Sequence, residues 1–314
     1  MIELVLTATG AQRLRFAISP LEEVLGAIQV LEGARRHPAY GPWLSTAAEH
    51  ARTLPLTELR TVLGATRYIT EFLSPPPQGP RTTVDAQLAE LRRTPPEQVA
   101  LELAMVDADL SGLPEDPARA RDLLGDQLEL AWHELIEPQW PRLHEVLAAD
   151  IDHRTRRLGE GGIELALADL HSRVKLTGDV LTVESAARSR TALDERGLLL
   201  LPSVFAWPKI GVILVPPWQP SLLYPARGVA RLWGPSRDPD PRLVAVLGRT
   251  RALLLQVLAE PSTTTALARR LGLAPATVSG HLRALAGAGL LAATRHGRSV
   301  RYARTRLGAD LVGA

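Results

Sequence analysis

The residues best suited to chemistry in this sequence are short polar side chains and arginines close to the C-terminus. Ala276, Thr277, Gly280 and Arg283 recur at helical spacing on one side of a predicted helix, and Ser279 lies on its flank. Such a small, polar side suits a helix in the major groove of DNA, because only short or hydrogen-bonding side chains let a helix approach the base edges. The spacing therefore predicts DNA contacts.

The opposite side of the same helix carries the residues that would hold it in place. Val278, Leu282 and Leu285 recur at spacings of four and three and form a narrow apolar stripe. Pro275 falls in the first turn, where the missing N–H of proline leaves no helical hydrogen bond unmade.

A shorter helix is predicted upstream. The hydroxyl side chains at 262–265 can cap a helix over 266–271, and Gly272 would end it. Two short helices joined by such a turn predict a helix-turn-helix. Downstream, strand-like runs at 290–294 and 300–304 flank the basic segment RHGRS, which predicts a β-hairpin of the kind that forms the wing of a winged helix.

The residues predicted to contact DNA divide by role. Thr277 and Ser279 can donate hydrogen bonds to base edges or phosphates, whereas Arg283, a turn further on, is predicted to reach phosphate. The arginines of the hairpin suit phosphates or a narrow minor groove. The predicted set is Thr264, Pro275, Ala276, Thr277, Ser279, Gly280, His281, Arg283, Arg295, Arg298 and Arg301.

Charge is distributed unevenly along the chain. Residues 241–314 contain eleven arginines, no lysine and two acidic residues, a net charge of +9, whereas residues 1–240 carry 25 basic and 32 acidic residues, a net charge of −7. A general preference for arginine over lysine would explain why the basic residues are arginines. It would not explain why this segment contains so few Asp and Glu residues. The asymmetry predicts a polyanionic partner for the basic segment and disfavours a helix-turn-helix that contacts only proteins.

The motif LGLAPATVSGHLRALAGAGLL followed by TRHGRSVRY corresponds, in order and spacing, to the recognition helix and wing of a known family. On these residues, the segment 241–305 resembles the winged helix-turn-helix of the ArsR/SmtB family of bacterial transcriptional regulators. The sequence departs from that family at Ala274, where a Ser or Thr cap is usual, and at Gly280, where a larger polar residue is common. The resemblance implies a cytoplasmic regulator, a repressor, that binds double-stranded operator DNA as a homodimer.

The N-terminal part shows a second resemblance, carried by the run LLLLPSVFAWPKIGVILVPPWQPSLLYPARGVARLW. This run resembles the long N-terminal region of ArsR-like regulators of actinobacterial type. Helical periodicity followed by short apolar runs between prolines and glycines predicts an α+β fold, with a helical part, an antiparallel sheet, and an initial hairpin formed by 2–7 and 14–18. The composition of 234–241 predicts a linker between an N-terminal effector or dimerisation domain, 1–236, and a C-terminal winged helix-turn-helix domain, 237–314.

Composition excludes several classes of site. The chain has no cysteine, which rules out disulfides, thiolate metal sites and cysteine nucleophiles. Absence of cysteine is also consistent with a reducing cytoplasm. The N-terminus lacks the pattern of a signal peptide, and prolines interrupt the most apolar stretch, 198–218, so no membrane partner is expected.

Patterns for catalysis or metal binding are weak. His133 and Glu137 lie four residues apart on a predicted helix, but no second histidine completes a zinc-protease pattern, and an exposed helix face is the simpler interpretation. Gly159, Gly161 and Gly162 lack the flanking residues of a phosphate loop and predict a helix end. We therefore expect no enzyme activity, no cofactor and no metal. The alternative is an enzyme-like or protein-interaction N-terminal domain with an accessory DNA-binding winged helix.

Aromatic residues cluster late in the N-terminal part, in a chain that contains few of them. Two interpretations of this cluster remain open: the rings fill the core of the sheet, or some of them line an apolar pocket for a small organic effector. The residues concerned are Trp207, Trp218, Tyr224 and Trp233.

Overall fold

The computed structural model describes residues 1–64, 70–232, 241–258, 261–271, 273–296 and 299–313. The chain divides into two compact units, Met1–Trp233 and Gly234–Ala314, each with its own hydrophobic core. The fold is α+β, as predicted. The predicted boundary between 236 and 237 lies outside the described residues.

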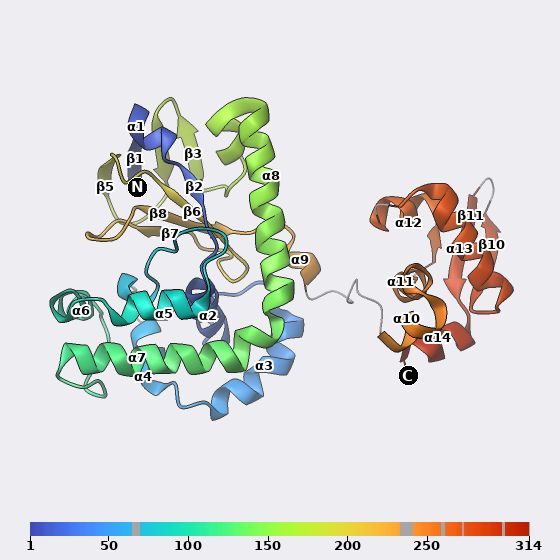
Figure 1. The fold of residues 1–314 in the computed structure, drawn as a ribbon, viewed down its shortest axis with the longest axis horizontal. Helices are drawn as coiled ribbons and strands as arrows, with labels where there is room; N and C mark the ends of the chain where they lie inside the picture. Colours follow the sequence, from blue (N-terminus) through green and yellow to red (C-terminus); the bar gives the residue numbers. More distant parts are fainter. Residues whose placement is uncertain (65–69, 233–240, 259–260, 272, 297–298, 314) are drawn as a thin grey trace. The chain divides into compact units, whose positions relative to one another are not determined.

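The first unit combines a helical layer with two sheets (Figure 1). Its helices are α1 (Ala8–Gln12), α2 (Pro20–Leu31), α3 (Gly41–Thr53), α4 (Thr57–Leu63), α5 (Val84–Arg92), α6 (Pro96–Leu103), α7 (Pro117–Ala131), α8 (Trp140–Leu167) and α9 (Val229–Leu232), with tighter or wider helical turns at Pro38–Tyr40, Glu71–Leu73, Trp132–Ile136 and Glu137–Gln139. Its strands are β1 (Ile2–Leu6), β2 (Arg15–Phe16), β3 (Val174–Thr177), β4 (Val180–Val183), β5 (Ser189–Leu193), β6 (Leu199–Ser203), β7 (Gly211–Ile213) and β8 (Ser221–Pro225).

Helix α2 lies at the centre of the helical layer. Ser19 caps its N-terminus by accepting a hydrogen bond from the Glu22 N–H at 3.1 Å, and Pro20 occupies the first turn. Every residue of α2 except Leu31 is buried, because α3, α4, α5 and α7 pack around the helix and β6 covers another side. The helix is therefore the element against which the rest of the layer packs.

The two sheets are mixed, which corrects the prediction of an antiparallel sheet. In the first sheet, ordered β3-β4-β1-β5, β4 is antiparallel to β3 and β1, but β5 is parallel to β1. In the second, ordered β2-β6-β8-β7, β6 is parallel to β2 and β8, and β7 is antiparallel to β8. All residues of β6 and β8 are buried, and strands covered on both faces lack the alternation that would reveal their pairing.

The predicted hairpin at the N-terminus is wrong. Helix α1 occupies the segment between β1 and β2, and these two strands belong to different sheets. The runs 2–7 and 14–18 do contain strands, and Phe16 of the second run packs against the cluster of Leu4 and Leu6 as well as against the core of the helical layer.

Helix α8 runs beside the sheets and reaches the helical layer (Figure 1). Its backbone is interrupted at Gly161 and at Gly162, whose φ of +68° favours glycine, and it then continues to Leu167. The helix end predicted at 159–162 is therefore present, and a second helical segment follows it across a kink. The buried Arg154 pairs with Asp150 at 3.0 Å, and Asp150 also accepts a hydrogen bond from the Tyr224 hydroxyl at 2.7 Å. This pair fastens α8 to β8.

The second unit is built around a separate apolar cluster. Its elements are α10 (Pro241–Leu247), α11 (Arg249–Val257), β9 (Ser262–Thr263), α12 (Thr264–Leu271), α13 (Pro275–Gly287), β10 (Leu291–His296), β11 (Ser299–Arg304) and α14 (Arg306–Gly313). The strands form one antiparallel sheet ordered β10-β11-β9. A helix-turn-helix followed by a β-hairpin is thus present in the order that the sequence predicts.

One buried carboxyl links α2 to the segment after β6. Both oxygens of Glu23 lie 3.1 Å from the Val204 N–H, which donates to them. Burial raises the pKa of Glu23 from 4.5 to about 8, against the opposing effect of hydrogen bonds from Ser203 and Val204. The folded state therefore holds a proton that the unfolded chain releases near pH 4.5. The resulting stabilisation is complete below that pH and is lost as the pH rises to about 8.

Replacing Glu23 with Gln keeps an oxygen that can accept from Val204 but removes the titrating proton. Between about pH 5 and pH 8, we expect the free energy of unfolding of the wild type to fall more steeply than that of Glu23→Gln, by up to about 1.4 kcal/mol per pH unit. Chemical denaturation across this range measures the difference. If the free energy of unfolding depends on pH in the same way in the wild type and in Glu23→Gln, Glu23 is not the group that binds the proton.

Candidate nucleic-acid interface

Helix α13 is held by the apolar stripe that the sequence predicts. Val278 and Leu282 are fully buried and Leu285 is 1% exposed. They belong to the same cluster as Leu255 of α11 and Leu267 of α12, the two helices that α13 contacts. Because this side is fixed in the core, the helical period determines which residues face solvent.

The opposite side of α13 is exposed, and its residues are small or polar. Arg283 extends back along the helix, and its Nε donates to the Ser279 carbonyl oxygen at 3.4 Å. The exposed members of the predicted set are Pro275, Ala276, Thr277, Gly280 and Arg283, while Ser279 and His281 are half-buried.

The N-terminus of α13 has no side-chain cap. Ala274 precedes it in an extended conformation, with φ −65° and ψ 136°, and contributes no capping hydrogen bond. The first N–H groups of the helix therefore lack a side-chain acceptor, and such groups bind phosphate oxygens at the N-termini of helices. Ala274, which stands where the ArsR/SmtB family usually has Ser or Thr, thus leaves the first N–H groups of α13 able to donate to phosphates of the DNA backbone.

The short helix α12 precedes α13. The Thr263 hydroxyl oxygen accepts the Ala266 N–H at 3.3 Å, and Thr264, the first residue of the helix, is half-buried. The Leu273 N–H donates to the Ala268 carbonyl oxygen at 3.0 Å and closes the turn. The predicted terminator, Gly272, lies outside the described residues.

The hairpin of β10 and β11 places arginines at the surface. Tyr302 is 8% exposed and anchors β11 in the core, and its neighbour Arg301 points to the other face, which is exposed. Arg295, on β10, is also exposed, but the predicted Arg298 lies outside the described residues. Arg304 has a different role, since its Nε donates to the Leu258 carbonyl oxygen at 3.1 Å and ties the hairpin to the end of α11.

The exposed arginines differ in their pairing. Within the part of the chain that the structure describes, neither Arg283 nor Arg301 has a carboxylate within 4.0 Å. Arg306, on α14, reaches Asp310 at 4.0 Å, but both side chains are exposed and such a pair contributes little. Unneutralised surface arginines are the groups that DNA phosphates attract.

The aromatic residues considered for an effector pocket do not come together. Trp207 contacts the rings of His37 and His171, at centroid distances of 5.5 and 5.3 Å. The indole N–H of Trp218 donates to Glu102 at 2.7 Å, whereas the fully buried Tyr224 binds Asp150. Trp233 lies outside the described residues. Trp207, Trp218 and Tyr224 line none of four cavities among the described residues.

The other polar patterns form ordinary surface pairs. His133 contacts Glu137 at 2.8 Å, and this hydrogen bond raises the pKa of His133; Glu134 instead contacts His50 at 2.7 Å. The described residues contain no group of three or more His, Asp or Glu side chains arranged to hold a metal ion. No helix within the described ranges combines the length and apolar character needed to cross a membrane.

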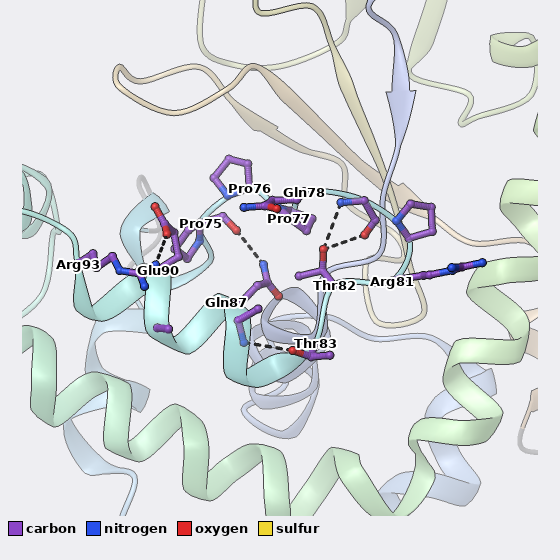
Figure 2. Close-up of a pocket in the computed structure, with 14 residues that line it drawn as sticks. Pro75, Pro76, Pro77, Gln78, Arg81, Thr82, Thr83, Gln87, Glu90 and Arg93 are labelled. Atoms are coloured by element: carbon purple, nitrogen blue, oxygen red, sulfur yellow. Dashed lines mark hydrogen bonds and ion pairs between the residues drawn. The ribbon is translucent and has the colours of Figure 1, made fainter.

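A cavity of about 780 Å³ lies between α5 and the proline-rich segment 75–80 (Figure 2). Some of its polar groups bind one another. Gln87 donates to the Pro75 carbonyl oxygen at 2.8 Å, and the Thr82 hydroxyl donates to the Gly79 carbonyl oxygen at 2.9 Å.

Sequence reasoning missed a second cavity, of about 570 Å³, in the same unit. Its wall comes from segments spread between Ile2 and Leu223, and includes Glu22, Arg35 and Glu71. No spacing along the chain could have indicated it, because the fold alone brings these segments together.

Comparison with known families gives two matches. Residues 248–293, which include α12 and α13, match a helix-turn-helix domain. Residues 110–230 match a family of unknown function, DUF5937. No curated protein and no solved structure matches the chain. The helix-turn-helix match supports a DNA-binding regulator.

Substitution of Gly280 tests whether the backbone of α13 lies close to DNA. A Cβ at this position would meet no atom within 4 Å, so alanine fits the free protein. Glycine inside a helix destabilises it by about 1 kcal/mol relative to alanine. We expect Gly280→Ala to raise the free energy of unfolding of the C-terminal unit by about that amount without tightening DNA binding. Thermal denaturation and DNA titration measure the two effects, and tighter binding would refute close approach of the backbone.

Proposed function

We propose that this protein is a sequence-specific transcriptional regulator of the ArsR-like type, whose winged helix-turn-helix binds operator DNA in the cytoplasm. One observation carries the proposal: the small, polar side of α13 is exposed while its apolar stripe is fully buried. Two exposed arginines without a carboxylate within 4.0 Å among the described residues support it: Arg283 on the same helix and Arg301 on the adjacent hairpin. The net charge of +9 on 241–314 supplies the attraction to phosphate.

We further infer that the regulator acts as a homodimer and a repressor. A single short recognition helix contacts few base pairs, and proteins with this motif gain specificity by binding two half-sites one helical turn apart. The N-terminal unit is then the candidate for dimerisation and for control by a small organic effector, without catalysis. Repression is what the resemblance to the ArsR/SmtB family implies.

Arginine variants test whether the hairpin acts through charge. Arg301→Ala should weaken binding to specific and random duplexes alike, and should reduce the slope of log affinity against log salt by about one unit. Arg306→Ala removes the same charge from α14, outside the helix-turn-helix and hairpin, and serves as the matched control. Fluorescence anisotropy over a range of salt concentrations, with duplex from upstream of the coding sequence, measures both. An unchanged slope in Arg301→Ala would contradict docking through the hairpin.

Thr277 tests base recognition separately from charge. Thr277→Ala should change the preference at one base pair by about 1–3 kcal/mol, because it removes a hydroxyl that can reach a base edge. Thr265→Ala is the control, since the exposed Thr265 lies on α12, and the first helix of this motif crosses the DNA backbone. Competition between duplexes with single base-pair substitutions reports the preference. A uniform loss across all duplexes would assign Thr277 to phosphate instead.

A further inference from the structure

The second cavity of the N-terminal unit lies where α2 and β7 meet the ends of the paired strands β1 and β4, at Ile2 and Val183. Its volume of about 570 Å³ falls within the range of pockets that hold small organic molecules. Much of the wall is apolar. The apolar residues are Ile2, Leu25, Leu63, Val183, Ile210, Val212, Ile213 and Leu223.

Three residues of this wall carry buried polar atoms that have no hydrogen-bond partner among the described residues. The atoms are Gln29 Oε1, Arg35 Nε and Thr70 Oγ1, and the residues are 4%, 7% and 1% exposed. An unsatisfied buried polar group costs about 1–3 kcal/mol, and native proteins contain few of them. Two of the three, Arg35 Nε and the Thr70 hydroxyl, can donate to a ligand, which indicates a ligand that accepts hydrogen bonds.

The cavity wall carries three basic side chains, Arg35, Arg173 and Lys209, and three acidic ones, Glu22, Glu71 and Glu184. Among the described residues, neither Arg35 nor Lys209 has a carboxylate within 4.0 Å. Burial, and then the charge of Arg35, lower the pKa of Lys209, so each cation lies within the field of the other. Burial raises the pKa of Glu71 to about 8 and also raises that of Glu22. Glu22 and Glu71 therefore stay protonated to a higher pH than ordinary carboxyl groups. A protonated carboxyl carries no charge and does not neutralise Arg35 or Lys209.

We propose that this cavity binds a small organic acid, with its apolar body against the aliphatic wall and its carboxylate facing Arg35 and Lys209. An anion relieves the repulsion between Arg35 and Lys209 and accepts from Arg35 Nε, whereas an amine would add a further positive charge. The site differs from the aromatic pocket that the sequence suggested. A role of the acid in controlling DNA binding rests on the proposed function, but the binding itself does not.

Titration calorimetry of the full chain without DNA tests the binding. The probes are octanoate and phenylacetate, compared with octylamine and phenethylamine, which share their apolar bodies. We expect at least one acid to bind with a 1:1 stoichiometry, about tenfold or more tightly than its matched amine. Failure of both acids to bind at millimolar concentration, or equal binding of the amines, would overturn the proposal.

The two lysines of the chain provide a matched pair of variants. Lys209→Gln removes a charge from the cavity, and Lys175→Gln removes the same charge from an exposed position on β3 that does not line it. We expect Lys209→Gln to weaken the binding of the acid roughly three- to tenfold, and Lys175→Gln to leave it unchanged. If the two variants weaken the binding of the acid equally, the acid responds only to the net charge of the protein. This result would contradict the proposed site.

A second pair separates ligand contact from structural support. Thr70→Val removes an unpartnered hydroxyl, so the unliganded protein should be no less stable while its affinity for the acid falls. Thr94→Val is the control, because Thr94 Oγ1 is also buried and unpartnered but lines none of the four cavities. If Thr70→Val binds the acid as tightly as the wild type, the Thr70 hydroxyl does not contact the ligand, contrary to the proposal. Because none of these assays contains DNA, their failure would leave the proposed DNA binding intact, and a protein that fails to bind DNA could still bind the acid.

Discussion

The burial of one narrow apolar stripe decides what the C-terminal unit presents to solvent. Val278, Leu282 and Leu285 are at most 1% exposed, and no rotation of α13 could keep them in the core while hiding its opposite side. The exposed side consists of short residues and Arg283, and its first turn has no side-chain cap. The same core receives Tyr302 and thereby fixes the hairpin that carries Arg301. The features attributed to DNA binding therefore depend on a hydrophobic contact that involves none of them.

Buried charge imposes the corresponding constraint on the N-terminal unit. Asp150 and Arg154 are both fully buried, which is tolerated because hydrogen bonds from Tyr224 and to the Ala166 carbonyl oxygen accompany their ion pair. Arg35 also donates to a carbonyl oxygen, that of Phe205, but its Nε has no partner. Among the described residues Arg154 Nη2 has no partner either, but Arg35, unlike Arg154, lines the second cavity, and this position is the physical reason to assign binding there.

The C-terminal unit could be predicted closely from its sequence, because short-range spacing determines its helices and hairpin. The stripe on α13 and the position of the hairpin are confirmed, whereas Gly272 and Arg298 lie outside the described residues. Strand pairing in the N-terminal unit could not be predicted, since β6 and β8 are buried on both faces and carry no alternation. The helix end predicted at 159–162 is present, but the sequence did not indicate that a second helical segment follows directly after the kink. Cavities escape such reasoning altogether, because they arise from segments distant in sequence.

The most direct test of the account is selection of DNA by the full chain from a random pool of duplexes, followed by sequencing. We expect enrichment of a pseudo-palindromic sequence whose half-sites lie about 10 base pairs, one helical turn, apart, as two copies of α13 in successive major grooves require. Recovery of a single unrepeated half-site would contradict the proposed dimer. Recovery of no sequence preference at all, with binding that depends only on salt, would contradict the central claim that the exposed side of α13 recognises bases.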